Sequence, residues 1–553
     1  MSSSRHAADG VAVSTDDYLY FVGRAVRGMA AIVEALGDDL AGTRPDLPGA
    51  NTPYGLLTHC LGVVEYWAGQ LVAGRDVVRD RTGEFEAHGT VKELLARTED
   101  ALRQLAVDVA SAWSHEPLRR NPDGWAQGPD RRLTQGGVLL HVYEEVAQHH
   151  GQMEILRDLL RAQPTEKADV SPWQPPLSWL RAKRGVKWRR PGPDLLPAWV
   201  ADMDFPVAPV IRAAISDVLD RGDLGYPDWL NVPRHPLADA FAERMSHRYG
   251  WTPQPAHVRG VTDLIQAVQI VLTLDSRPEQ AVVAHTPNYP PFLATIAGMR
   301  RLIAAPLITT GHSWTWDHAR LEADVRDADA AVLLLVNPHN PTGRVFTRGE
   351  LEQIAELAQA HDLIVISDEI HAELNYGGAP HIPFAALSDE TAARTVTVTS
   401  ATKAFNIAGV RTAVAHVGPN RLRDAWDAQP PDLYGTANVL GVEATLAAWQ
   451  HGDAWLAGTV EHLYHQRDHL VERVAELPGV TMLAPEASYL AWLNCADATI
   501  EGDPAAFFRR TAKVELSPGP DYGPGNERRV RLNFANSRDF LDAILDRLAT
   551  ALH

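Results

Sequence analysis

The segment Thr395-Val-Thr-Val-Thr-Ser400-Ala-Thr-Lys403-Ala-Phe-Asn-Ile-Ala-Gly-Val-Arg411 joins a strand-like run to a polar stretch that carries one lysine. Three earlier apolar runs, at 281–284, 331–336 and 363–366, are also short, and helix-like patterns lie between them. Short buried strands that alternate with helices are typical of an α/β layer with a mostly parallel sheet. The second half of the chain is therefore predicted to be an α/β unit, with Lys403 just after one of its strands.

Length and composition limit the broad class of the protein. At 553 residues the chain is too long for one hydrophobic core, so several domains are expected. The net charge of -19 argues against nucleic acid or an anionic membrane as the main partner. The N-terminus lacks the apolar core of a signal peptide, and apolar runs such as 330–336 are too short to span a bilayer. The two cysteines give no disulfide framework, so we expect a cytoplasmic protein.

The chain is predicted to be multidomain. Residues 14–162 contain amphipathic helix patterns without strand-like alternation, and they are expected to form a four-helix bundle. Residues 163–176 are polar and proline-rich, which is typical of a linker. Residues 177–553 are expected to form the α/β unit, with a smaller α+β lobe that includes about 430–553.

Two further motifs precede the lysine segment, and each follows an apolar strand candidate. They are Asn337-Pro-His-Asn340-Pro-Thr-Gly343-Arg and Ile366-Ser-Asp368-Glu-Ile-His371. Either motif alone is ambiguous, because Asn-Pro-x-Asn-Pro is common in turns and an aspartate after a strand is often a helix cap. The three motifs in this order resemble the active site of fold-type I enzymes that use pyridoxal 5′-phosphate (PLP).

The resemblance implies a role for each matching residue. Lys403 matches the lysine that holds the PLP aldehyde and later removes the substrate α-proton. Asp368 matches the carboxylate that pairs with the ring nitrogen, where a protonated ring acts as the electron sink. Arg531 matches the arginine that binds the substrate α-carboxylate through two parallel hydrogen bonds, with Asn340 beside it. The remaining cofactor contacts implied are Asn340 at the ring hydroxyl, Tyr289 stacked on the ring, His371, and Thr262, Asp263, Ser400 and Arg411 around the phosphate.

The start of the second half narrows the resemblance. Lys187-Trp188, Leu196-Pro-Ala-Trp199-Val-Ala-Asp202-Met-Asp204-Phe-Pro and Gly225-Tyr226-Pro resemble the cystathionine β-lyase-like branch of the class I and II aminotransferases. That branch implies that Tyr226 reaches the phosphate in a neighbouring subunit, and therefore a homodimer, with Lys403, Tyr289 and Tyr226 as the catalytic residues. The expected reaction is β-elimination from a cysteine S-conjugate, which gives a thiol, pyruvate and ammonia.

Two other functions remain open because the same residues serve them. The chain could be a PLP-dependent aminotransferase with a vestigial bundle, or a PLP-binding sensor without catalysis. The segment that contains Pro520 and Asp521 departs from the small or apolar residues often found in relatives, so we expect an unusual substrate side chain.

The N-terminal half contains a possible metal site. Glu145 and His149 are four residues apart and share one face of a predicted helix, and His59 lies on another helix. Two imidazoles and a carboxylate suit zinc or another divalent transition metal. His141, one turn before Glu145, is expected to be exposed rather than a partner of the ligands, and His150 points about 100° away from the ligand face.

This half resembles the DinB-like superfamily, which includes the metal-binding domain of mycothiol-dependent maleylpyruvate isomerase. The resemblance implies a metal-dependent transfer of a low-molecular-weight thiol. We therefore expect a bifunctional enzyme of sulfur metabolism, with a thiol S-transferase bundle joined to a carbon–sulfur lyase.

Overall fold

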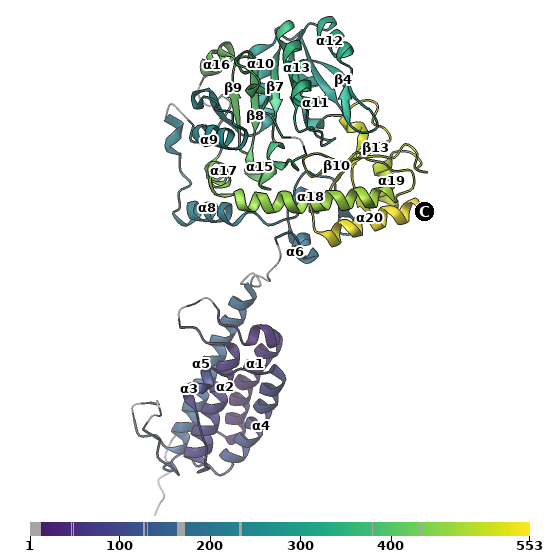
Figure 1. Cartoon of the computed structure of the whole chain (residues 1–553). Coiled ribbons are helices and arrows are strands. Elements are labelled where there is room, and N and C mark those ends of the chain that lie inside the picture. The colour runs from purple at the N-terminus through teal and green to yellow at the C-terminus, as the bar shows by residue number, and fades with distance from the viewer. Residues whose placement is uncertain are drawn as a thin grey trace, which may run out of the picture. The chain divides into compact units, whose positions relative to one another are not determined.

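The computed structural model describes residues 13–162 and 172–553, apart from gaps at 46, 48, 125, 127, 130, 232–234, 379 and 431–432. The chain divides into two compact units after residue 169. Figure 1 shows an all-helical first unit and a second unit in which helices surround a sheet. This confirms the predicted fold classes of both halves. Residues 163–171 of the predicted linker lie outside the described residues.

The first unit is a bundle whose helices begin where the sequence supplies capping side chains. Thr52 accepts a hydrogen bond from the Gly55 amide, and Thr90 and Glu93 form a capping box. The predicted second helix changes to π-helical geometry after residue 63. The elements are α1 (Thr15–Ala41), α2 (Pro53–Val63), the π-helix η1 (Val64–Val72), α3 (Arg81–Phe85), α4 (Val91–Val109) and α5 (Gln135–Ala162).

An eight-stranded sheet forms the centre of the second unit. Strands β3, β4, β6, β7 and β8 are parallel, whereas β9 runs antiparallel to β8. In sheet order the strands are β2 (Val258–Val261), β9 (Ala413–Val417), β8 (Thr395–Thr399), β7 (Ile364–Asp368), β6 (Ala330–Val336), β3 (Ala281–Thr286), β4 (Arg301–Thr309) and β5 (Trp314–Trp316). The short apolar runs of the sequence are therefore neighbours in one sheet.

Alternate residues of these strands are buried on opposite faces of the sheet. Val282 and Ala284 pack with α10 (Leu264–Asp275), α11 (Pro290–Met299) and α16 (Asn420–Asp427) on one face. Ala281 and Val283 pack with α12 (His318–Asp327) and α13 (Arg348–Ala360) on the other. Both faces are thus covered by helices, which explains why the strands are apolar at almost every position.

The smaller lobe has its own three-stranded sheet, in the order β10 (Leu490–Asn494), β13 (Arg529–Asn533) and β12 (Ser517–Pro518). A segment from the start of the unit joins it, because β1 (Leu196–Pro197) pairs in parallel with β11 (Val514–Glu515). Within the predicted linker, Trp173 already packs against Phe205 of the second unit, with ring centroids 5.3 Å apart. The lobe therefore combines both ends of this unit.

The remaining elements connect these layers and complete the smaller lobe. The longer helices are α8 (Pro209–Asp220), α9 (Leu237–Tyr249), α17 (Val439–His451), α18 (Asp453–Ala475), α19 (Pro504–Thr511) and α20 (Arg538–Leu552). The short helices are α6 (Leu177–Ala182), α7 (Val186–Arg189), η2 (Asp228–Asn231), η3 (Pro255–His257), η4 (Ala372–Leu374), η5 (Phe384–Ala386), α14 (Asp389–Ala392), α15 (Ala401–Ala404), η6 (Ala408–Val410) and η7 (Gly519–Tyr522).

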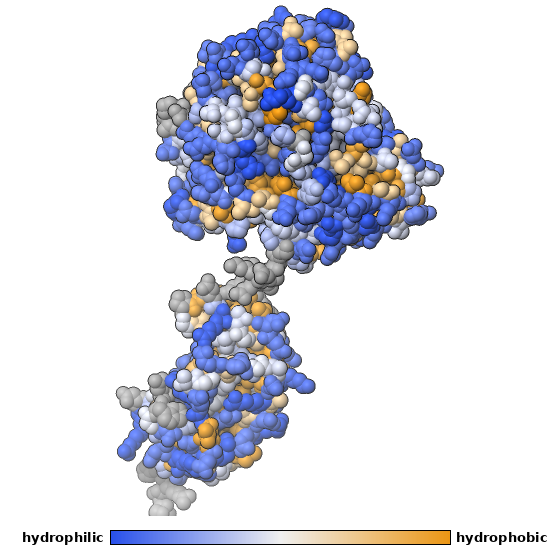
Figure 2. All heavy atoms as spheres, in the orientation of Figure 1, coloured by the Kyte–Doolittle hydropathy of each residue, from blue (hydrophilic) through white to orange (hydrophobic). Residues whose placement is uncertain are grey.

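The visible surface of the protein is mostly polar. Figure 2 shows mostly hydrophilic residues over the visible face of both units, with hydrophobic residues in small groups. Among the described residues, none of the helices has both the length and the apolar character needed to cross a membrane.

Candidate functional site

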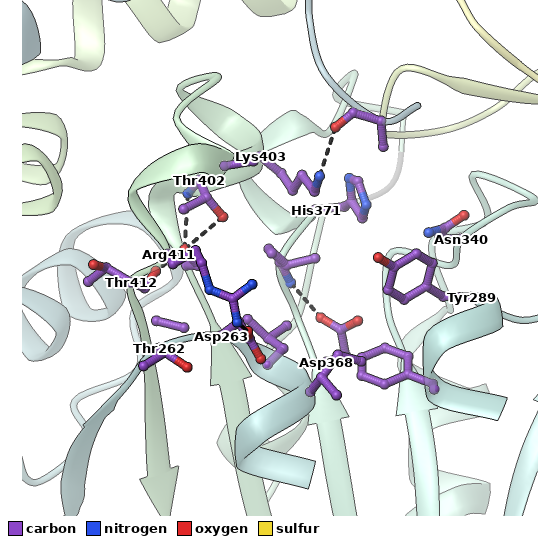
Figure 3. A pocket seen from close by; sticks show the side chains of 18 residues that line it. Thr262, Asp263, Tyr289, Asn340, Asp368, His371, Thr402, Lys403, Arg411 and Thr412 are labelled. Carbon is purple, nitrogen blue, oxygen red and sulfur yellow. Dashed lines mark hydrogen bonds and ion pairs between the residues drawn. The ribbon is translucent and has the colours of Figure 1, made fainter. Parts of the chain in front are cut away.

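A cavity of about 260 Å³ lies where the strands of the large sheet end. Most of its polar residues follow the carboxyl ends of β2, β6, β7 and β8, and Arg411 precedes the antiparallel β9. Figure 3 shows these side chains around one space. The sequence-predicted residues that line it are Thr262, Asp263, Tyr289, Asn340, Asp368, His371, Ser400, Lys403 and Arg411. The sheet topology therefore brings together residues that are up to 149 positions apart, from Thr262 to Arg411.

Lys403 is held at the wall of the cavity by α15. Its Nζ donates a hydrogen bond to the Ala201 carbonyl oxygen at 2.7 Å. Burial lowers the pKa of the Lys403 amine, and the carboxylates of Asp202 and Asp368 oppose part of this shift. A lysine with a lowered pKa is more easily neutral, which is the form that can attack an aldehyde or accept a proton.

Asp368 ends β7 and is 4% exposed. One of its carboxylate oxygens accepts a hydrogen bond from the Ile370 amide at 3.0 Å. Within the described residues no cationic side chain forms an ion pair with it, and burial raises its pKa to about 7. A buried carboxylate without a cation fits a ligand that brings its own positive charge, such as the protonated ring nitrogen of PLP.

Replacing Asp368 by asparagine is expected to stabilise the cofactor-free second unit at about pH 8 by about 4 kcal/mol. This follows from the interval between the ordinary pKa of 3.8 and the raised pKa of about 7, at about 1.36 kcal/mol per pH unit. The folded chain holds this proton more tightly than the unfolded chain. The cost of ionising Asp368 is therefore absent below about pH 3.8, grows until about pH 7 and is complete above it.

Calorimetric unfolding of both apoproteins between about pH 5 and pH 8 checks this expectation. The wild type should lose stability relative to D368N as the pH rises. A constant difference between the two proteins across this range would contradict the assignment of the buried, unpaired carboxylate.

The other end of the cavity suits a phosphate. The amino end of α10 lies there, with Asp263 as its capping residue, and the Arg411 side chain forms an ion pair with Asp263. Helix amino ends and arginine side chains both bind phosphate oxygens. The Ser400 hydroxyl instead donates to the Thr412 carbonyl at 2.5 Å, and the Thr262 hydroxyl donates to Gln266 at 3.1 Å. Both hydroxyls are therefore already engaged, and the donors for a phosphate would be backbone amides and those N–H groups of Arg411 that do not face Asp263.

Arg531 does not line this cavity but contacts Asn340, which does. Its guanidinium donates to Asn340 Oδ1 at 3.1 Å and to the Trp199 carbonyl at 2.9 Å, and it lies over the Tyr522 ring. Arg531 is 4% exposed, its Nε has no hydrogen-bond partner, and none of the described carboxylates pairs with it. A buried cation without an anion fits the carboxylate of a substrate.

Sequence reasoning did not identify several residues beside Lys403 and His371. Tyr489 donates its hydroxyl proton to the same Ala201 carbonyl at 2.9 Å, and Ser488 Oγ lies 3.1 Å from His371 Nδ1. Ser488 has a φ of 72°, which is rare for a residue with a side chain and often marks a functional site. Burial lowers the pKa of His371 to about 3, with Lys403 and Arg531 adding to the shift, so its ring is neutral.

Two sequence-based expectations concern residues outside the cavity. Tyr226 is 96% exposed and does not contribute to the site of its own chain. Asp521 is also exposed, whereas the next residue, Tyr522, is buried against Arg531. The unusual residues at 520 and 521 therefore lie outside the cavity lining, and Tyr522 is the one that contacts Arg531.

The first unit brings the predicted ligands His59, Glu145 and His149 together. One ligand atom from each lies within 4.8 Å of the others. Glu145 Oε2 is 3.9 Å from His59 Nε2 and 3.7 Å from His149 Nε2. Two nitrogens and one carboxylate oxygen at this spacing fit a divalent cation with open positions for other ligands.

The expectation that His141 is exposed is wrong. His141 is 7% exposed, its ring meets the Trp67 ring edge-on at 4.7 Å, and neither ring nitrogen has a hydrogen-bond partner. The reason is that His141 shares the ligand face of α5, and η1 places Trp67 opposite it. His150 faces α1 instead, because a Cβ on Gly28 would lie 2.3 Å from His150 Nε2.

Comparisons with known proteins match both units. A family model described as aminotransferase class I and II matches residues 200–548, and one described as mycothiol-S-transferase matches residues 19–162. The cystathionine beta-lyase PatB of Bacillus subtilis is 34% identical, over 67% of this chain and 97% of its own length.

Solved structures agree with these matches. A putative PLP-dependent beta-cystathionase from Corynebacterium diphtheriae has a TM-score of 0.64 at 34% identity, covering 68% of this chain and 98% of its own. A PLP-bound C-S lyase from Staphylococcus hominis has a TM-score of 0.62 at 28% identity, covering 67% of this chain and 96% of its own.

Proposed function

The chain belongs to the class I and II aminotransferase family of PLP-dependent enzymes, and from this membership we propose that its second unit is a carbon–sulfur β-lyase. The observation that carries the proposal is a pair of buried charged side chains without an ion-pair partner among the described residues. Asp368 lines the same cavity as Lys403, and Arg531 contacts Asn340 of that lining. The substrate class proposed is a cysteine S-conjugate. Elimination is proposed rather than transamination, because these relatives are described as cystathionine beta-lyases and a C-S lyase.

When bound, PLP supplies an electron-withdrawing ring that stabilises negative charge at the substrate α-carbon. Asp368 would pair with the ring nitrogen, Tyr289 would stack on the ring, Asn340 would bind the ring hydroxyl, and Arg411 with the amino end of α10 would hold the phosphate. Arg531 orients the substrate through its α-carboxylate. Lys403 then takes the α-proton, the carbon–sulfur bond breaks, and the sulfur leaves as a thiolate that gains a proton. One water completes the reaction, so that thiol, pyruvate and ammonia are released.

The test is to incubate the purified PLP-loaded protein with cystathionine and to measure pyruvate and free thiol together. Equal amounts of both products support β-elimination. If neither appears, a keto acid acceptor is added, and conversion of that acceptor to an amino acid would replace the lyase by an aminotransferase. No turnover under either condition with a range of S-substituted cysteines would overturn both activities.

For the first unit we propose a metal-dependent thiol S-transferase. His59, Glu145 and His149 would hold the ion, with zinc as the expected metal. A bound divalent cation lowers the pKa of a coordinated thiol and yields a thiolate at neutral pH. The partner would be a low-molecular-weight thiol, and the match to mycothiol-S-transferase supports this class. In this proposal the bundle would attach or exchange a low-molecular-weight thiol, and the second unit would cleave an S-substituted cysteine so that the sulfur stays on the released thiol.

The second unit is proposed to act as a homodimer in which Tyr226 completes the site of the partner. The support is its exposure of 96% next to Leu224, which is 59% exposed. Hydrophobic and aromatic side chains that protrude in this way are common at subunit interfaces.

Mixing two inactive variants tests the shared site. A Tyr226→Phe chain and a Lys403→Ala chain should together recover about one quarter of wild-type lyase activity after random re-pairing of subunits. The reason is that half of the dimers contain both chains, and each of these has one site with an intact Lys403 and an intact Tyr226. Mixtures no more active than the separate variants would contradict a shared site.

A further inference from the structure

Glu84 lies against the predicted metal ligand His59, at the ring nitrogen that does not face the other ligands. Glu84 Oε2 is 2.8 Å from His59 Nδ1, whereas His59 Nε2 is the atom that faces Glu145, at 3.9 Å. The two ring nitrogens therefore have different neighbours. Nδ1 meets the Glu84 carboxylate of the short helix α3, with a terminal nitrogen of Arg79 farther away at 3.4 Å, and Nε2 points to the ligand group.

Arg79 fixes the orientation of the Glu84 carboxylate. Its guanidinium donates to both carboxylate oxygens, with Nε 2.7 Å from Oε1 and a terminal nitrogen 2.9 Å from Oε2. The side chains of Arg79 and Glu84 are 5% and 7% exposed. A buried fork of two parallel hydrogen bonds leaves the carboxylate little freedom to rotate, so His59 receives it in a defined direction.

The backbone around His59 is shaped to admit this pair. Gly62 is one turn after His59 on α2, and a Cβ at this position would lie only 1.9 Å from Glu84 Oε1. Phe85, the neighbour of Glu84, stacks on the His59 ring with centroids 4.4 Å apart and an interplanar angle of 26°. Asp80 caps α3 by accepting a hydrogen bond from the Gly83 amide. The short helix α3 thus packs Glu84 and Phe85 against the His59 ring.

We propose that Glu84, held by Arg79, is a positioning residue for His59 at the metal site. The carboxylate accepts the proton on Nδ1, which keeps that proton on Nδ1 and leaves the lone pair of Nε2 directed to the ion. Metal-binding histidines commonly donate their other ring N–H in this way, which fixes the tautomer and strengthens the ligand. This inference rests on the proposed metal site and adds to it a residue that is not itself a ligand.

The alternative is that Glu84 and His59 form an ion pair that only stabilises the bundle. That alternative predicts lower stability after substitution, with no change in metal affinity while the bundle remains folded. The positioning role predicts a change in affinity even in a folded variant. The two are therefore separated by a binding measurement on folded protein.

The experiment uses the full PLP-loaded chain, freed of metal by a chelator and titrated with Zn²⁺ against a chromophoric competitor. E84Q keeps an oxygen acceptor but loses the charge, and it should bind Zn²⁺ about 10-fold more weakly than wild type. E84A loses both and should bind about 100-fold more weakly. The matched control is Glu65→Gln, which removes a carboxylate from another ion pair in the bundle, with Arg97. It should bind as wild type does.

The outcomes distinguish the two proposals. If wild-type protein binds no Zn²⁺, or H149A binds it as tightly as wild type, the metal site itself is wrong. If wild type binds Zn²⁺ and H149A does not, but E84Q and E84A keep full affinity, the positioning role of Glu84 is wrong and the site stands. Far-UV circular dichroism monitors folding, and E84Q decides the question if E84A does not fold.

Discussion

Replacing Lys403 by alanine is expected to lower kcat for pyruvate formation from a cysteine S-conjugate by at least about 10³-fold. Lys403 provides the only lysine amine among the described residues that line the cavity, and its lowered pKa suits both proposed roles. His371, the histidine among the described residues of the lining, is a poor substitute as a base, because burial lowers its pKa to about 3. Initial rates of pyruvate and thiol release, measured at equal PLP content, give the effect.

The control is Lys183→Ala, which removes a lysine of the same unit that stacks on Trp179 and does not line the cavity. It should keep the wild-type rate. The K403A protein should also retain any thiol-transfer activity of the bundle, because that activity is assigned to the other unit. Pyruvate formation at a near wild-type rate in K403A would end the assignment of Lys403 and of the lyase mechanism built on it.

The gathering of the predicted residues in one cavity could be predicted because it depends on strand ends. Asn340, Asp368 and Lys403 each follow a short apolar run, and parallel strands place such positions at one edge of a sheet. Contacts made by backbone groups could not be predicted in this way. The Ala201 carbonyl that holds Lys403 belongs to a segment whose place is set by the pairing of β1 with β11. A distant strand pair leaves no local signal in the sequence.

In the bundle, too, features set by local sequence could be predicted, whereas features set by long-range packing could not. The four-residue spacing of Glu145 and His149 fixes their common face on any helix. The burial of His141 depends on the position of Trp67 across the bundle, which the π-helical turn determines. Glu84 lies 25 residues after His59 in a short helix whose packing is likewise long-range. The one local signal was Gly62, because a glycine inside a helix often marks a close approach of another group.

Replacing Arg531 by lysine is expected to raise KM for a cysteine S-conjugate by about 100-fold, with a smaller change in kcat. Lysine keeps the positive charge, so the substitution tests the geometry of the arginine fork rather than its charge alone. The buried guanidinium has no carboxylate partner among the described residues, and its fixed contacts are Asn340 and the Trp199 carbonyl. Steady-state kinetics with cystathionine measure the effect, and Arg538→Lys, at the start of α20, is the matched control.

A substrate whose α-carboxylate is replaced by a carboxamide separates recognition from packing. If Arg531 binds the carboxylate, the wild type should discriminate strongly against the amide, and R531K should lose most of that discrimination because its ammonium cannot form the paired hydrogen bonds. If Arg531 only supports β13 and Tyr522, the substitution should lower kcat/KM for the acid and for the amide by the same factor. It should also lower the free energy of unfolding. Equal losses for both substrates would therefore reject the carboxylate clamp, even if R531K were less active. A larger loss of kcat/KM for the acid than for the amide would place the substrate α-carboxylate at Arg531, beside Asn340. The α-carbon attached to it would then lie at this side of the cavity, where Lys403 is proposed to remove its proton.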